Sequence, residues 1–285
     1  MKCDLCPRKC LVDRKKGEKG ICGQTENLKV ARAALHFWEE PCISGDAGSG
    51  AVFFSGCPLH CVFCQNENIA NGTVGKEISL ERLVDIFLEL QEKRANNINL
   101  VTPGHFVPQI VKALDQARKE GLTLPVVYNT SSYETVDTIK MLEGYVDIYL
   151  PDFKYMSPVL SKKYSHAPDY AEVAKAAIAE MVRQTGKAVF VNGDEDNLIL
   201  SGTIVRHLTL PGCMADSMQI LKYLHDTYGD MIYISIMNQF TPLSNLEKYP
   251  ELNRRITDEE YETLVDYAID IGIENGFIQE GDTAE

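Results

Sequence analysis

Three closely spaced cysteines, Cys57, Cys61 and Cys64, restrict the fold and chemistry of this chain more than any other feature. They follow the pattern C-x3-C-x2-C, directly after a short apolar run at residues 51–56 that is typical of a buried strand. We expect them on the loop that leaves this strand. Disulfides need defined Cα separations, and three thiolates cannot all pair, whereas one iron–sulfur cluster can bind all three. The alternatives are a zinc knuckle or three unrelated buried thiols.

The composition limits the classes of protein to consider. A chain of 285 residues with 45% apolar residues is long enough for one α/β domain and a small appendage. No run approaches the ~18–20 apolar residues of a membrane span, and the first residues lack the apolar centre of a signal peptide. We therefore expect a reducing cytoplasm, where nine cysteines favour metal ligation or catalysis over disulfides. The net charge of −13 disfavours nucleic-acid binding by the whole surface and leaves a local basic patch open.

A second group of cysteines lies at the start of the chain, in the pattern C-x2-C-x3-C-x11-C. Its members are Cys3, Cys6, Cys10 and Cys22. The glycines and the proline among them predict a loop-rich segment too small to bury a core, and such segments are commonly stabilised by a metal. Four thiolates suit zinc or a second iron–sulfur cluster, and the spacing does not separate the two. Four free thiols are the alternative.

We therefore divide the chain into a Cys-rich metal-binding segment with its connector, residues 1–50, and a core domain, residues 51–285. Within the connector, Cys42 is predicted to be a small core residue, with ligation by Cys42 and His36 as the alternative. His36 and Trp38 are predicted to pack at the junction between the two parts. The glycines that follow then lead into the first strand of the core domain.

Apolar runs alternate with amphipathic stretches through the core domain. The predicted strands cover residues 51–56, 98–101, 124–128, 146–150, 188–191, 204–210, 231–236 and 276–280, with a hairpin tip at 192–197. One predicted helix follows the cap Ser79, others cover 106–120, 133–143, 168–184 and 214–228, and the last opens on a capping box of Thr257 and Glu260. This alternation implies parallel pairing through right-handed crossovers, and hence an α/β fold with a partial (β/α)6 barrel. In such barrels the chemistry gathers at the carboxyl ends of the strands.

The cysteine loop resembles that of the radical S-adenosylmethionine (SAM) superfamily, and Phe63, the aromatic residue before the last cysteine, fits it. An iron–sulfur cube usually takes four cysteines, so three leave one iron open. The resemblance implies that SAM binds this iron of a [4Fe–4S] cluster. Reductive cleavage of SAM then yields a 5′-deoxyadenosyl radical that takes hydrogen from a substrate. Over residues 51 to about 240, the chain resembles most the pyruvate formate-lyase activating enzymes and their uncharacterised relatives.

This resemblance implies SAM contacts at successive strand ends. The candidate residues are Phe63, Thr102, Pro103, Gly104, Asn129, Thr130, Asp152, Lys154, Arg206 and Asn238. The Asp-x-Lys of the family matches residues 152–154, and its Arg before a Pro-Gly matches Arg206. The chain also departs from the pattern. The residues Thr-Pro-Gly stand where the family has Gly-Gly-Glu, Asn129 replaces an acid, and Asn238 stands near a lost histidine.

The resemblance further implies a flavodoxin- or ferredoxin-like electron donor, and a glycine in a partner protein as the hydrogen source, as in the activation of glycyl radical enzymes. One alternative is radical modification of a small molecule or of RNA, with Cys213 participating as a thiyl donor. The other is a non-catalytic metal-binding module for interaction or electron transfer. From its sequence position, Cys213 is also suited to be a buried or helix-capping thiol. His207 is predicted to be a hydrogen-bonded barrel residue.

Overall fold

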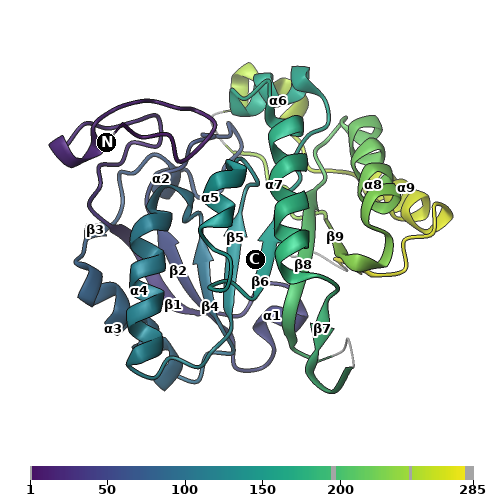
Figure 1. The fold of residues 1–285 in the computed structure, drawn as a ribbon. Helices are drawn as coiled ribbons and strands as arrows, with labels where there is room; N and C mark the ends of the chain where they lie inside the picture. The colour runs from purple at the N-terminus through teal and green to yellow at the C-terminus, as the bar shows by residue number, and fades with distance from the viewer. Residues whose placement is uncertain (1, 194–196, 244–245, 280–285) are drawn as a thin grey trace.

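The fold is built on one curved sheet surrounded by helices (Figure 1). A computed structural model describes residues 2–193, 197–243 and 246–279. The strands are β1 (Lys29–His36), β2 (Ser49–Phe54), β3 (Lys76–Glu77), β4 (Ile98–Val101), β5 (Val126–Thr130), β6 (Ile148–Pro151), β7 (Val189–Phe190), β8 (Ile199–Leu208), β9 (Tyr233–Met237) and β10 (Gly276–Ile278). The helices are α1 (Pro41–Ser44), α2 (Glu67–Ala70), α3 (Leu80–Glu92), α4 (Val107–Lys119), α5 (Val136–Lys140), α6 (Pro158–Ser165), α7 (Tyr170–Thr185), α8 (Met214–Tyr228) and α9 (Asp258–Asp270).

The order of the strands is that of an open parallel barrel. The sheet runs β10-β9-β8-β6-β5-β4-β2-β1-β3, and β7 pairs with β8. Every pair from β2 to β10 along this path is parallel, while β1 is antiparallel to β2 and to β3. Across the described residues the edge strands β10 and β3 do not pair, so the barrel is not closed. The α/β class and the partial barrel are thus confirmed.

Local sequence signals predicted several elements well. Helix α8 has the predicted bounds, and the Ser79 hydroxyl caps α3 by accepting from the backbone N–H of Arg82 at 3.2 Å. The capping box at the start of α9 is present, with Thr257 and Glu260 bonded to each other's backbone N–H groups. The predicted hairpin at 192–197 joins β7 to β8, and its residues 194–196 lie outside the described residues.

Two predictions for the connector were wrong. Residues 29–36 form the strand β1, which pairs along most of its length with β2. Buried and exposed residues do not alternate regularly along β1, so no local pattern predicts a strand there. Pairing with β2 makes this segment a strand. Trp38 does not pack at a junction, because it is 88% exposed, whereas the His36 ring contacts that of Phe53 edge-on at 6.2 Å. The short helix α6 was not predicted.

Two separate apolar clusters cover the two faces of the sheet. The larger one lies between the sheet and helices such as α3, α4, α7 and α8, which surround the outer face (Figure 1). The smaller one fills the amino-terminal end of the barrel, where Cys42 and Ile43 of α1 meet Val127 and Ile148 from the inner face. Cys42 is 3% exposed, which confirms it as a small core residue. No helix in the described part of the chain is both long and apolar enough to cross a membrane.

Candidate functional site

The loop after β2 brings Cys57, Cys61 and Cys64 together at the carboxyl end of the barrel. All three thiols are free and partly exposed. The loop is tightly folded: His60 has a φ of 50°, and the Cys64 N–H donates to the Cys61 carbonyl at 3.0 Å. The N–H of Leu59 also points at the Cys57 sulfur, 3.5 Å away. The strand therefore ends in a loop that presents three sulfurs, as the spacing predicts.

The three thiols fit a [4Fe–4S] cluster. Burial raises the pKa of each thiol, to about 12 for Cys57, and a neighbouring cysteine raises it further for Cys57 and Cys64. As thiolates, three neighbouring cysteines would repel one another, and ligation to iron would offset this charge. Among the described residues, no group of three or more His, Cys, Asp or Glu side chains is arranged around a single metal ion. A cube does not require that arrangement, because each thiolate binds a different iron.

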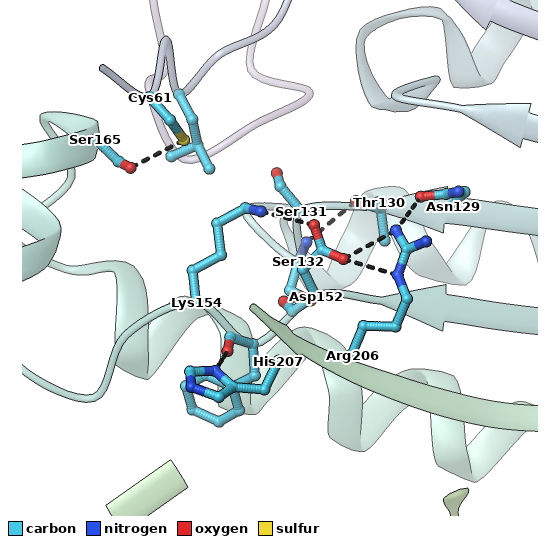
Figure 2. A network of polar contacts seen from close by, with 12 residues as sticks. Cys61, Asn129, Thr130, Ser131, Ser132, Asp152, Lys154, Ser165, Arg206 and His207 are labelled. Atoms are coloured by element: carbon cyan, nitrogen blue, oxygen red, sulfur yellow. Dashed lines mark hydrogen bonds and ion pairs between the residues drawn. The ribbon is translucent and has the colours of Figure 1, made fainter. Parts of the chain in front are cut away.

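A buried network of charges lies below this loop, at the ends of β5, β6 and β8 (Figure 2). The Arg206 guanidinium donates to Asp152 Oδ1 at 3.0 Å and to Asn129 Oδ1 at 2.7 Å. Lys154 Nζ donates to Asp152 Oδ2 at 2.7 Å. Burial by itself would raise the pKa of Asp152, but the charges of Lys154 and Arg206 outweigh it and lower that pKa. The carboxylate therefore stays ionised inside the barrel.

Glu39 completes this network, and no sequence motif predicted it. Its carboxylate accepts from Arg206 Nη1 at 3.0 Å, from Asn129 Nδ2 at 3.1 Å and from Asn99 Nδ2 at 3.2 Å. The side chain is 8% exposed. Glu39 comes from the segment between β1 and α1, which was predicted to be a connector. Because that segment has no strand-end motif, only the folded barrel places its carboxylate beside Arg206.

Strained backbone marks three successive parallel strands at the same end of the barrel. Besides His60 after β2, Thr102 after β4 has a φ of 54° and Ser132 after β5 has a φ of 62°. Positive φ is rare for residues other than glycine, and for a β-branched threonine it is an outlier. Such strain is retained where the surrounding structure fixes it, often at functional sites. Its position here supports a binding site at the mouth of the barrel.

Three residues predicted to contact SAM lie outside the charged network. The Thr130 hydroxyl donates to Glu134 at 2.8 Å, and a Cβ added to Gly104 would collide with the same carboxylate. Glu134 is buried, which raises its pKa to about 7. The Phe63 ring is 6% exposed and meets the ring of Phe240 edge-on at 6.0 Å. The Thr130 and Phe63 side chains are therefore engaged outside the network, and Gly104 lies against the Glu134 carboxylate.

The remaining candidates have simpler surroundings. Pro103 precedes the short turn that leads into α4, and the Asn238 N–H donates to Gln279 Oε1 at 3.1 Å. His207 is confirmed as a hydrogen-bonded barrel residue: its ring nitrogens lie 2.8 Å from the Phe153 carbonyl and 2.8 Å from the Ser217 hydroxyl. Cys213 occupies the N-cap position of α8 and is partly buried, without a side-chain capping bond.

The N-terminal cysteine segment, residues 3–22, lies against the cysteine loop (Figure 1). Arg8 Nε donates to the Pro58 carbonyl at 2.9 Å, and the His60 ring lies 2.8 Å from the Ile21 carbonyl. A Cβ added to Gly56 would collide with the backbone oxygen of Cys22. Burial raises the pKa of Cys6, to about 12, and that of Cys22, and nearby cysteines of the segment contribute. The two groups of cysteines are therefore neighbours at one end of the barrel.

A cavity of about 260 Å³ opens beside the charged network, on the open side of the barrel. Its wall includes Glu39, Glu40, Arg206, Gln239 and Phe277. Glu40 is buried, which raises the pKa of its carboxyl group, and it accepts from the Ser235 hydroxyl at 2.9 Å. Among the described residues, the cavity therefore reaches Arg206 from the side of the barrel that carries β10.

Comparisons with known proteins agree with this geometry. A family model described as the radical SAM superfamily matches residues 51–197. The chain is 27% identical over 275 residues to MJ0674, an uncharacterised protein of Methanocaldococcus jannaschii, which covers 93% of this chain and 74% of that protein. Among solved structures, HydG, a maturase of the [FeFe]-hydrogenase, has a TM-score of 0.53 at 14% identity, over 79% of this chain and 50% of that one.

A second similar structure is SuiB of Streptococcus suis bound to its precursor peptide SuiA. It has a TM-score of 0.52 at 12% identity, over 79% of this chain and 46% of that one. The chain therefore spans about half the length of each of these two solved proteins. At these identities the likeness concerns the fold alone, and it matches the open parallel barrel described above.

Proposed function

The chain belongs to the radical SAM superfamily, and from this premise we propose that Cys57, Cys61 and Cys64 hold a [4Fe–4S] cluster in an active enzyme. Membership implies reductive cleavage of SAM by such a cluster, which supplies a 5′-deoxyadenosyl radical. The observation that carries the proposal is the position of the cysteine loop directly above a buried charged network at the mouth of the barrel. Loop and network come from different strands and meet at the end where barrel enzymes place their chemistry.

The network would bind and orient SAM. Arg206 offers a planar guanidinium that matches a carboxylate, and Asp152, held ionised by Lys154 and Arg206, offers acceptors for ribose hydroxyls. Asn129 adds an amide next to them. Because these groups are already bonded to one another, they hold a fixed geometry before a ligand arrives, which lowers the entropic cost of binding.

For the substrate, we propose a glycine in a partner protein. The support is the resemblance of residues 152–154 and of Arg206 to the motifs of glycyl radical enzyme activases. The cavity on the open side of the barrel would admit a peptide segment from the side toward Arg206. A flavodoxin- or ferredoxin-like protein would deliver the electron in a reducing cytoplasm, consistent with nine free cysteines. Radical modification of a small molecule or RNA is the competing assignment, and a non-catalytic module is the other.

We also propose that the N-terminal cysteines bind a metal, as zinc or as a second iron–sulfur cluster. Among the described residues no three of these thiols surround a single ion, so zinc would require them to draw together, whereas each thiolate of a cluster binds its own iron. Residues 3–22 have little core of their own, since Leu11 and Ile21 are about half exposed. The segment nevertheless folds back on itself, because the Cys3 N–H donates to the Val12 carbonyl at 2.9 Å and the Leu11 N–H to the Cys3 carbonyl at 3.0 Å. A metal would explain how such a segment keeps its shape. The boundary at residue 50 between this part and the core domain stays a prediction.

The test compares wild-type protein with the triple variant Cys57→Ala/Cys61→Ala/Cys64→Ala, both reconstituted anaerobically, with Cys42→Ala as the control for loss of a cysteine. Iron, sulfide and zinc are counted, and 5′-deoxyadenosine is assayed after adding dithionite and SAM. We expect the triple variant to lose about four irons and all nucleoside formation, and Cys42→Ala to lose neither. A wild type that takes up no cluster and cleaves no SAM would refute the proposal and favour the non-catalytic module.

The substrate is tested separately. Wild-type enzyme is incubated with SAM and a candidate glycyl radical enzyme, and the partner is examined by electron paramagnetic resonance for a protein radical. A glycyl signal that needs both SAM and the cluster supports protein activation. Label transfer from 5′-deoxyadenosine to a small molecule or RNA, without such a signal, would support the competing assignment instead.

A further inference from the structure

One cysteine of the loop receives a hydrogen bond from a distant side chain. Ser165, the last residue of α6, donates its hydroxyl hydrogen to the sulfur of Cys61 at 3.0 Å (Figure 2). The two residues are 104 positions apart in the chain, and Ser165 is fully buried. A buried hydroxyl aimed at a candidate cluster ligand has a direct electrostatic effect on that ligand, because no water screens it.

A tyrosine fixes the direction of this bond. The Tyr155 hydroxyl lies 2.8 Å from the Ser165 hydroxyl, and Tyr155 is 1% exposed. A serine hydroxyl has one hydrogen to give, and Ser165 gives it to Cys61. Tyr155 must therefore donate to Ser165, so the chain runs from Tyr155 through Ser165 to the Cys61 sulfur. Hydrogen bonds in such a chain polarise and strengthen one another.

Further hydrogen bonds hold the backbone around Ser165 against the cysteine loop. The Val62 N–H donates to the Tyr164 carbonyl at 2.9 Å, so the loop and the end of α6 share a backbone bond. From the N-terminal segment, Arg8 donates to the Ser165 carbonyl at 3.0 Å and to the Pro58 carbonyl at 2.9 Å. These bonds fix the backbone of Ser165 relative to the loop, so its hydroxyl has little freedom to turn away from the Cys61 sulfur.

We propose that Ser165 is a positioning residue that raises the reduction potential of the cluster by hydrogen bonding to Cys61, with Tyr155 orienting its hydroxyl. The inference rests on the proposed function, since it requires the loop to hold the cluster. Reduction adds one electron, taken from a flavodoxin- or ferredoxin-like donor, and increases the negative charge on the sulfurs. A hydrogen bond to sulfur stabilises that added charge, so it favours the reduced cluster.

The experiment is a redox titration of the reconstituted full-length protein, followed by the electron paramagnetic resonance signal of the reduced cluster. The variants are Ser165→Ala and Tyr155→Phe. Ser161→Ala is the matched control, because Ser161 is a buried serine of the same helix whose hydroxyl donates to the Pro158 carbonyl. At a fixed potential, we expect Ser165→Ala to lower the ratio of reduced to oxidised cluster about fivefold. Tyr155→Phe should shift it less in the same direction, and Ser161→Ala not at all.

The iron count separates the possible failures. Wild-type protein that binds no iron overturns the proposed function and this inference together. Loaded wild type and loaded Ser165→Ala with equal potentials overturn the inference alone. If Ser165→Ala does not load, Tyr155→Phe decides: a negative shift supports the hydrogen-bonded chain, and an unchanged potential overturns it. Recovery of the wild-type potential by Ser165→Thr, which keeps the hydroxyl, is the remaining supporting result.

Discussion

The two cysteine regions of this molecule lie side by side, and they are anchored in different ways. The loop at residues 57–64 leaves a buried strand, and a backbone bond ties it to α6. The N-terminal segment contains no helix or strand apart from one short 3-10 turn at Arg14–Lys16. It is attached by long side chains: Arg8 reaches the cysteine loop and α6, and Arg14 donates to the His105 carbonyl.

Under the proposed assignments, this difference predicts which region needs a bound metal for its shape. The loop inherits its position from the barrel, so its geometry exists before any cluster binds. The N-terminal segment gains little from apolar burial, because Leu11 and Ile21 are about half exposed. Polar bonds hold it instead: those of its arginines, those within its own backbone, and contacts from Thr138 and His60 to its carbonyls. Ligation of its thiols would add to these.

The largest effect is expected from changing the N-terminal cysteines together. The variant Cys3→Ser/Cys6→Ser/Cys10→Ser/Cys22→Ser should lose one metal population completely, either zinc or the iron in excess of the loop cluster. It should keep the cooperative unfolding of the barrel, because the barrel does not depend on this segment. Metal analysis and thermal unfolding measure both. A barrel that no longer folds would show that the two regions form one folding unit.

The buried network of the barrel should tolerate change far less than a surface pair. Arg206→Met leaves Glu39 and Asp152 buried without their guanidinium partner, and breaking such a pair costs roughly 3–5 kcal/mol. Arg82→Met, which breaks an exposed pair with Glu89, should cost far less, because solvent screens exposed ion pairs. Urea unfolding of the two variants gives both values. Equal losses would mean that the network contributes no more than surface charges.

Acid should destabilise the junction between the two regions. His105 is 4% exposed, and its ring lies 2.7 Å from the Ser55 carbonyl. Its backbone carbonyl accepts a hydrogen bond from the Arg14 guanidinium. Burial lowers its pKa to about 4; the Ser55 carbonyl opposes this and Arg14 adds to it. In the unfolded chain the pKa is about 6.5, so the unfolded state binds more protons between these values. Stability is then full above about pH 6.5 and falls as the pH drops toward 4.

The matched variant is His105→Gln, which has no titrating ring. We expect the difference in unfolding free energy between wild type and variant to change by up to about 3 kcal/mol between pH 7 and pH 4.5. Urea unfolding across this range measures it. Parallel pH profiles for the two proteins would contradict the assignment of a neutral His105 in the fold.

The smallest effect is expected from loosening the attachment of the N-terminal segment. Arg8→Met removes donors to the carbonyls of Pro58, Ser165 and His166 and should cost about 1–2 kcal/mol, because the site is partly exposed. Arg8→Lys should not restore it, since an ammonium lacks the planar fork. Limited proteolysis should cleave the segment faster in both variants than in wild type. Lys16→Met, a change of an exposed lysine, is the control and should leave cleavage unchanged.

Much of this protein was determined by the sequence itself, because the signals concerned are local. The spacing of Cys57, Cys61 and Cys64 and the strand before them predicted the cysteine loop. The cap Ser79 and the capping box of Thr257 and Glu260 predicted where two helices begin, since a cap bonds to backbone within a few residues. Alternating strands and helices predicted the open parallel barrel, because crossover connections leave few other ways to bury both faces.

The tertiary structure alone decided which distant side chains meet. Glu39 and Arg206 are 167 positions apart, and Ser165 and Cys61 are 104 apart, so no local pattern relates them. Thr130 and Asn129 are adjacent, yet one side chain joins Glu134 and the other joins the charged network, because alternate residues of a strand face opposite sides of the sheet. Register across the sheet and the path of the connections set these contacts, and both are fixed only when the barrel assembles.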